Sequence, residues 1–205
     1  YKVCMIAQPD WKKDEPFMEF GAPRLAFLVS AGNIDSMVNH YSVSKRRRDK
    51  DYYTDNGEMG KRPDRATIVY TRKLKQLYPQ VPVVIGGIEA SLRRLAHYDY
   101  WDNRVRPSIL IDSGADLLLY GMGENSIIEM AEALDGGLAI EDVIWIRGSA
   151  YRCRSIDHLF EHQLLPSYRE VARDKRKYAE SFRVQHLNID ALRAKILVEP
   201  YDGEY

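Results

Sequence analysis

Five consecutive side chains suited to ligand binding or catalysis stand near the middle of the chain: His97, Tyr98, Asp99, Tyr100 and Trp101. Aromatic faces beside carboxylates form the kind of site that holds a flat polar ligand. Histidine titrates near neutral pH and can act as a general base or a proton shuttle, so His97 is the candidate catalytic group. The alternative is an ordered aromatic loop whose aspartates pair with nearby arginines and whose histidine makes a hydrogen bond.

Two glycine turns stand close to this stretch in the sequence. Gly86 and Gly87 follow one apolar run, and Gly121 and Gly123 follow another 35 positions later. Glycine accepts positive φ and lets backbone N–H groups approach a ligand closely, while the helix that follows points its positive end at the same place. We expect the two turns to face one crevice. The alternative is that they only allow a strand and a helix to pack tightly.

Polar residues after the turns add candidate ligand contacts. Glu89 and Glu124 occupy matching positions, where their carboxylates could accept ribose hydroxyls or bind a cationic group. Glu124 could instead be a first-turn residue that the helix dipole stabilises. Ser91 and Arg93 extend the set after the first turn.

A third polar group follows an apolar run at residues 25–30 and consists of Asn33, Asp35 and His40. In open parallel sheets, the ligand crevice lies outside the carboxyl ends of the strands. We therefore expect all three groups to lie at that edge of one sheet.

Short apolar runs alternate with helical patterns along the chain, which predicts an α/β fold. Residues 81–85 and 115–120 lack the polar alternation of a strand with one wet face, as expected of parallel strands covered on both faces. With further strands at residues 2–8, 25–30 and 148–152, we predict a three-layer, Rossmann-like sheet of about five mostly parallel strands. Helices are expected at residues 35–41, 63–78, 90–96, 107–113 and 127–134.

The remaining segments have weaker patterns. Residues 42–62 contain few aliphatic side chains and predict a long irregular insertion. Ser167 and Glu170 have the spacing of a capping box, which predicts a helix from there to about Phe182. We expect a Rossmann-like domain over residues 1–155 and a helical extension or linker over residues 156–205.

Two long motifs resemble the N-terminal domain of the YgiQ-type radical SAM proteins. They are G-G-I-E-A-S-L-R-R-L-A-H-Y-D-Y-W-D from Gly86 and D-S-G-A-D-L-L-L-Y-G-M-G-E from Asp112. The resemblance continues through residues 9–11, 32–41, 62–67 and 165–168, and so covers most of the chain. It implies a cobalamin-binding-like, Rossmann-like domain that precedes a radical SAM barrel. The implied role is the accessory, substrate-facing part of an enzyme whose barrel carries a [4Fe–4S] cluster and uses S-adenosylmethionine.

The cysteines bear on whether this chain could hold that cluster. Radical SAM enzymes bind it through three thiolates in a C-x3-C-x2-C pattern, whereas this sequence has Cys4 and Cys153 alone. We therefore expect no cluster and no other metal in this fragment. Cys4 is expected to be buried in the first strand, and Cys153 to have a structural role in a loop.

Cobalamin is disfavoured on similar grounds. The similar domains that displace the lower base of the cofactor use a D-x-H-x-x-G motif, in which the histidine binds cobalt. Here Asp35-Ser36-Met37 has methionine at that position, and Asp10-Trp11-Lys12 has lysine. Base-on cobalamin binding and another nucleotide-like ligand stay open.

Charge and hydropathy limit the remaining alternatives. The formal net charge is zero, and no apolar stretch approaches the roughly 20 residues that span a bilayer, so we expect a cytoplasmic protein without membrane contact. The chain starts within an apparent strand and without Met, which predicts a fragment. The resemblance implies that its partner is its own C-terminal radical SAM domain. Lys45-Arg46-Arg47-Arg48 beside tyrosines supports another reading, in which a non-catalytic module contacts RNA or a small ligand.

Overall fold

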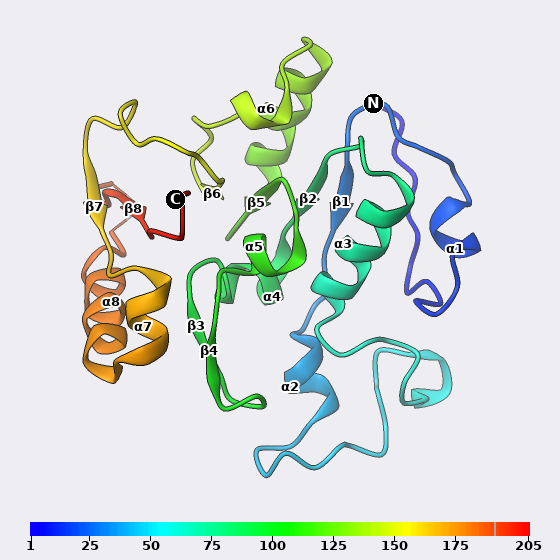
Figure 1. The fold of residues 1–205 in the computed structure, drawn as a ribbon. Coiled ribbons are helices and arrows are strands. Elements are labelled where there is room, and N and C mark those ends of the chain that lie inside the picture. The colour runs from blue at the N-terminus through cyan, green and yellow to red at the C-terminus, as the bar shows by residue number, and fades with distance from the viewer. Residues whose placement is uncertain (191) are drawn as a thin grey trace. The chain divides into compact units, whose positions relative to one another are not determined.

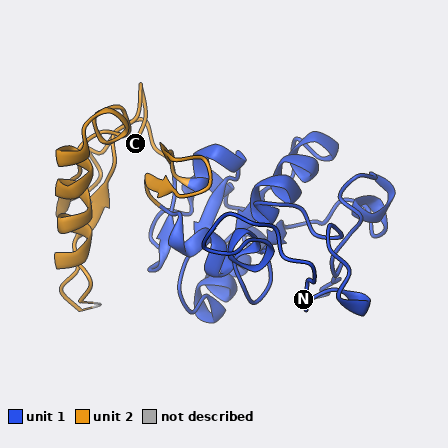
Figure 2. Cartoon of the chain, turned by 90° about the horizontal axis from the view of Figure 1, so that it is seen from below, with its two compact units in different colours: residues 1–94, 109–151 blue, residues 95–108, 152–205 orange. Residues whose placement is uncertain are grey.

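The computed structural model describes residues 1–190 and 192–205, which divide into two compact units (Figure 2). Unit 1 comprises residues 1–94 and 109–151, and unit 2 comprises residues 95–108 and 152–205. The hairpin of residues 95–108 thus belongs to the same unit as the C-terminal segment. A domain boundary near residue 155 stays a prediction.

A four-stranded sheet forms the centre of unit 1 (Figure 1). Its order is β1-β2-β5-β6, and the first three strands are parallel while β6 is antiparallel to β5. All residues of β2 and β5 are buried, which explains their unbroken apolar sequences. The predicted α/β class with a mostly parallel sheet is confirmed. The strands are β1 (Phe27–Val29), β2 (Val83–Ile85), β5 (Leu117–Leu119) and β6 (Ser149–Ala150).

Helices cover both faces of this sheet, because successive strand residues point to opposite sides. Val83 and Ile85 pack in one buried cluster with side chains of α3 and α5, whereas Val84 packs in a second cluster with Met130 of α6. Unit 1 is therefore a three-layer structure. Its helices are α1 (Glu15–Met18), α2 (Ser36–His40), α3 (Ala66–Leu77), α4 (Gly87–Leu92), α5 (Ile109–Ser113) and α6 (Glu124–Asp135), with short 3-10 turns η1 (Asp55–Gly57) and η2 (Ile140–Asp142).

The strand predicted at residues 2–8 is wrong, and the sheet has four strands rather than about five. In the described part of the chain, no backbone hydrogen bond joins residues 1–8 to the edge strand β1. A strand persists only where its backbone groups find ladder partners, and here Val3 and Met5 are 82% and 84% exposed. Cys4, which we expected to be buried, is consequently exposed.

Two helix predictions need correction. The helix expected at residues 90–96 is α4, which begins at Gly87 and ends at Leu92. The helix expected from residue 168 to about Phe182 is two helices, α7 (Tyr168–Arg173) and α8 (Lys175–Leu187). They separate at Asp174, whose backbone is extended and whose carboxylate accepts a hydrogen bond from Arg176 N at 2.7 Å. The predicted capping box of Ser167 and Glu170 is confirmed.

Unit 2 contains two small sheets. The antiparallel hairpin of β3 (His97–Asp99) and β4 (Arg104–Arg106) was not predicted. The other pair, β7 (His162–Leu164) and β8 (Ile196–Val198), is parallel, with α7 and α8 in the connection between its strands. In the described residues of both units, no helix is long and apolar enough to cross a membrane.

A buried carboxylate ties the hairpin of unit 2 to the segment after β8. Glu199 accepts hydrogen bonds from Ala96 N at 2.9 Å and from the Tyr201 hydroxyl at 2.7 Å. Burial raises the pKa of Glu199, and these two hydrogen bonds oppose the rise without cancelling it. The neutral acid is therefore favoured more strongly in the folded state than in the unfolded chain.

This raised pKa gives unit 2 a pH-dependent stability. The contribution of Glu199 is complete below its ordinary pKa of about 4.3 and is lost as pH rises through the raised folded-state value. We expect unit 2 to become more stable as pH falls from 7 toward 5. Glu199→Gln, which resembles the neutral acid, should weaken this dependence. Hydrogen exchange of the hairpin amides at both pH values measures it, and identical pH dependence in both proteins would contradict the assignment.

Candidate functional site

The carboxyl ends of β1, β2 and β5 open onto a hollow of about 310 Å³ within unit 1. Gly86 and Gly87 line it from one side, and Gly121, Gly123 and Glu124 line it from another. The two glycine turns therefore border the same hollow, as a crevice at the strand ends requires. Its other lining residues are mostly apolar: Leu28, Val29, Ser30, Val84, Ile85, Leu119 and Ile127.

Glycine is required at the first turn for steric reasons. Gly87 has a φ of +77°, and a Cβ atom there would lie 3.1 Å from the Cβ of Ser30. A Cβ on Gly86 would lie 3.1 Å from the carbonyl oxygen of Leu119. The backbone of this turn thus packs closely against both neighbouring strands, which a larger residue would prevent.

Ser91 joins the two turns. Its hydroxyl donates to the carbonyl of Gly87 at 2.8 Å and accepts from Gly121 N at 3.2 Å. Because one hydroxyl serves both turns, their spacing across the hollow is fixed by α4. Ser91 was predicted as a ligand contact, and its observed partners are the turns themselves.

Glu89 is almost completely buried, with 1% of its surface exposed, and it does not line the hollow. Its Oε2 accepts from Ser36 N at 2.8 Å and from Ser36 Oγ at 2.7 Å, and its Oε1 accepts from Thr67 N at 2.9 Å. Ser36 Oγ in turn accepts from Ala66 N at 3.1 Å. One carboxylate from the first turn of α4 therefore satisfies backbone donors at the starts of α2 and α3, where the helix dipoles favour negative charge.

Asp35 and Arg93 lie beside this carboxylate. One oxygen of Asp35 caps α2 by accepting from Met37 N at 2.9 Å and from Val38 N at 3.1 Å. The other oxygen forms a partly buried ion pair with Arg93. Asn33, the remaining residue of this predicted group apart from His40, is exposed. Asp35 and Arg93 thus support α2 rather than line the hollow.

His40 belongs to a second buried network. Its Nδ1 lies 2.7 Å from Asp64 Oδ1, and its Nε2 lies 3.5 Å from Asp51 Oδ2. Asp51 is wholly buried and accepts two hydrogen bonds from Arg62, at 2.9 and 3.0 Å. Sequence reasoning missed Asp51, Arg62 and Asp64 as a group, because they lie in and beside an irregular insertion whose pattern says nothing about burial.

Charge compensation keeps both aspartates of this network ionised. The hydrogen bond from His40, with a weaker one from Tyr41, holds the pKa of Asp64 below its usual range against the opposing effect of burial. Burial alone would raise the pKa of Asp51, but hydrogen bonds led by Arg62 outweigh it and lower the pKa. Both carboxylates therefore stabilise the folded state above pH 4 and lose that contribution in acid.

The predicted aromatic site forms the hairpin of unit 2. Asp99 is buried, and its Oδ1 accepts from Trp101 N and Asp102 N, each at 2.9 Å, which closes the turn. Tyr98 is half-exposed, and its hydroxyl donates to Asn103 Oδ1 at 2.5 Å. Tyr100 is also half-exposed and packs edge-on against Trp101. The Nδ1 atom of His97 lies 3.2 Å from the carbonyl oxygen of Leu95.

The structure thus distributes the predicted residues among distinct places. The glycines of both turns and Glu124 meet at the hollow, whereas Glu89, Asp35, Arg93 and His40 support it from buried networks. The residues from His97 to Trp101 lie in the other unit. Among the residues described, no group of three or more His, Cys, Asp or Glu side chains could hold a metal ion. Burial raises the pKa of the Cys153 thiol, which disfavours the reactive thiolate.

Truncation of the two glutamates that occupy matching sequence positions should change the free energy of unfolding by very different amounts. Glu89→Ala leaves three buried donors without a partner, so we expect a loss on the order of 3 kcal/mol in the free energy of unfolding. Glu124→Ala removes an exposed side chain and should change that free energy by less than about 0.5 kcal/mol. Urea unfolding of the two variants measures both effects. A loss of stability for Glu89→Ala as small as that for Glu124→Ala would show that the hydrogen bonds of the buried Glu89 carboxylate do not stabilise the fold.

Comparison with known proteins places the chain in a family. The model of the family described as "Radical SAM N-terminal" matches residues 1–205. A UPF0313 protein of Clostridium perfringens is 57% identical over 206 residues, which cover 100% of this chain and 31% of that protein. A UPF0313 protein of Clostridium botulinum is 49% identical over 205 residues, covering 100% of this chain and 32% of that protein.

No solved structure matches the chain. The chain spans about a third of the length of the curated relatives that it matches. The match over every residue, together with the strength of both similarities, shows that this chain belongs to the radical SAM N-terminal family.

Proposed function

We propose that this chain is the accessory, substrate-facing part of a cytoplasmic radical SAM enzyme. The observation that carries the proposal is the hollow at the carboxyl ends of three parallel strands, bordered by both glycine turns. Open α/β sheets bind their ligands at this position. Family membership supplies the link to radical chemistry.

The lining of the hollow indicates the kind of ligand that it would accept. Its floor is apolar and includes Leu119 and Ile127, while Glu124 provides an acidic group on the wall. A volume of about 310 Å³ is at the small end of ligand pockets. The proposed ligand is therefore a compact molecule with an apolar face and a hydroxyl or amino group for Glu124.

Cobalamin fits this lining poorly. Met37, which stands where the cobalt-binding histidine of similar domains would be, is buried and does not line the hollow. Lys12, at the alternative position, lies over the ring of Trp11. Neither position offers a group to cobalt at the strand ends.

The iron-sulfur cluster and S-adenosylmethionine belong in this proposal to the rest of the enzyme. Cys4 and Cys153 cannot supply three thiolates, and the described residues contain no cluster of potential ligands. When bound by a radical SAM barrel, the pair supplies a radical that abstracts hydrogen from a substrate. This chain's own contribution is to hold and orient that substrate.

Unit 2 offers a surface for the remaining part of the enzyme. Parallel strands are found almost only where both faces are covered, yet β7 and β8 leave Leu164 and Ile196 half-exposed. The partner that we propose for this face is the C-terminal radical SAM domain. The longer relatives support such a partner.

A non-catalytic ligand-binding module is the second candidate, and the same hollow supports it. The two candidates differ in the behaviour of the full-length protein. An enzyme should form 5′-deoxyadenosine from S-adenosylmethionine after anaerobic reconstitution and reduction, whereas a binding module should retain a compound without forming it.

A matched pair of substitutions on α6 tests the role of the hollow. Ile127 lines the hollow and is 38% exposed, whereas its neighbour Ile128 is 53% exposed and lies outside it. Ile127→Trp should fill the hollow and reduce the stimulation of 5′-deoxyadenosine formation by a small-molecule cell extract by between about fivefold and about 150-fold, because a ligand forced against the indole ring would lose about 1 to 3 kcal/mol of binding free energy. Ile128→Trp should leave the stimulation unchanged.

Formation of 5′-deoxyadenosine without added extract should be the same in both variants. If the wild-type full-length protein forms no 5′-deoxyadenosine, the proposal that it is a radical SAM enzyme is refuted. Equal stimulation in both variants would refute the substrate-facing role of the hollow while leaving the enzyme intact.

A further inference from the structure

The insertion of residues 42–62 carries a basic surface that the hollow does not use. We propose that this surface, which consists of Arg46, Arg48, Lys50 and Tyr52, binds the phosphate backbone and bases of a single-stranded nucleic acid. The proposal is independent of the function proposed for the hollow. It rests on four features of the segment: its paired backbone, its attachment to buried charged groups, its excess of positive charge and its exposed tyrosine ring.

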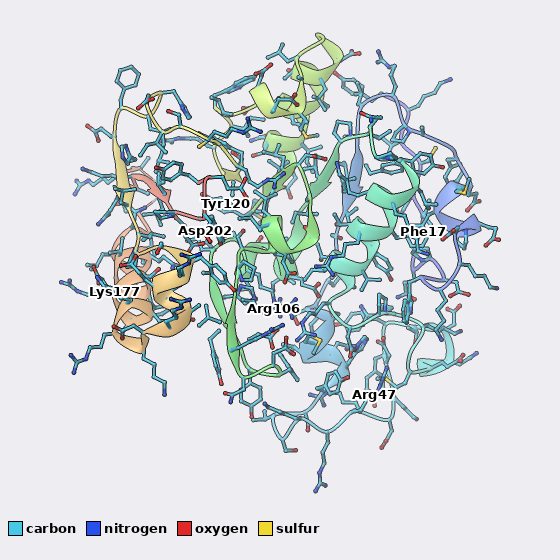
Figure 3. All side chains as sticks on the ribbon, in the orientation of Figure 1. Phe17, Arg47, Arg106, Tyr120, Lys177 and Asp202 are labelled. Atoms are coloured by element: carbon cyan, nitrogen blue, oxygen red, sulfur yellow. The ribbon has the colours of Figure 1, made fainter. Side chains whose placement is uncertain are left out.

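The basic run is the second arm of a short hairpin that extends from the C-terminus of α2. Ser42 N donates to the carbonyl of Arg46 at 2.8 Å, and Arg48 N donates to the carbonyl of His40 at 2.9 Å. Tyr41 and Arg47 form an antiparallel bridge between these two bonds. The backbone of the basic residues is therefore paired, unlike that of an open loop. Figure 3 marks Arg47 on this segment.

Buried charged groups anchor the base of the hairpin. His40 lies between Asp64 and Asp51, and Asp51 is held by Arg62 and by Asn39 Nδ2 at 2.8 Å. Asp51 N also donates to the carbonyl of Gly57 at 3.0 Å, which closes the second half of the insertion. A surface fixed in this way loses little conformational entropy when it binds a partner.

The exposed side of the hairpin has an excess of positive charge. Residues 42–62 contain seven lysines and arginines but four acidic residues, although the whole chain is neutral. Asp51 is already paired with Arg62, and Glu58 with Lys61. Arg46, Arg48 and Lys50 are exposed, and among the described residues no carboxylate lies within ion-pair distance of them. Arg46 and Arg48 occupy alternate positions of the paired arm, where side chains on one side repeat every ~6.8 Å, and Lys50 follows the bend at Asp49. This spacing suits successive phosphates.

An exposed aromatic side chain distinguishes a nucleic acid from other anionic partners. Tyr52 is 84% exposed and directly follows the buried Asp51, so its backbone is fixed while its ring faces solvent. Aromatic rings beside cations bind single strands because bases stack on them without regard to sequence. An anionic lipid surface would require the charges but no stacking platform.

Fluorescence anisotropy of labelled oligouridine and oligothymidine, each of about 12 nucleotides, tests the proposal with the full-length protein. The variant Arg46→Ser/Arg48→Ser/Lys50→Ser should reduce the slope of log affinity against log salt by about 2, since each phosphate contact contributes about 0.7. The matched control Arg173→Ser/Lys175→Ser/Arg176→Ser, which removes the same charge from α7 and α8 of unit 2, should leave the slope unchanged. Urea midpoints equal to that of the wild type confirm that both variants fold.

Tyr52→Ala separates stacking from charge. It should weaken binding by between about fivefold and about 150-fold, the range for loss of one stacked base, without changing the salt slope. Binding to either oligonucleotide that depends on these residues supports the proposal. It is overturned if neither oligonucleotide binds, if both triple variants lose affinity equally, or if vesicles of anionic phospholipid bind and the oligonucleotides do not.

Discussion

The carboxylate of Glu89 is the interaction on which the arrangement of unit 1 depends. It accepts hydrogen bonds from donors at the starts of α2 and α3, while its own backbone lies in the first turn of α4. Each donor left unpaired in a buried place would cost about 1 to 3 kcal/mol. Three helices therefore meet at one acidic group. Each of them adjoins a segment that takes part in one of the proposed functions. The turn of Gly86 and Gly87 begins α4, the basic hairpin follows α2, and Arg62 and Asp64 precede α3.

This arrangement separates the residues that support the hollow from those that can touch a ligand. Glu89, Asp35 and Arg93 use their polar atoms on one another and on helix ends. The glycine turns and Glu124 border the empty space instead. The strand ends thus present backbone groups and the exposed carboxylate of Glu124 over an apolar floor.

Local patterns in the sequence predicted much of this fold. The unbroken apolar runs that became β2 and β5, the two glycine turns, the end of α3 before Pro79 and the capping box at Ser167 each follow from short-range rules. The run at residues 2–8 obeys the same rules yet forms no strand, because the ladder partner that decides the outcome lies elsewhere in the chain. Glu89 and Glu124 look equivalent for a similar reason. The hydrogen-bond partners of Glu89 are Ser36 and Thr67, which lie 53 and 22 positions earlier in the chain. No local sequence pattern predicts contacts over such distances.

The exchange rates of the Ser36 and Thr67 amide protons with solvent deuterium test the central role of Glu89 most directly. Both amides donate to its buried carboxylate. They should therefore exchange no faster than the amides of β2 and β5, because exchange at all of these sites requires cooperative unfolding of unit 1. Exchange at the rate of an exposed loop, while the sheet amides remain protected, would contradict the account.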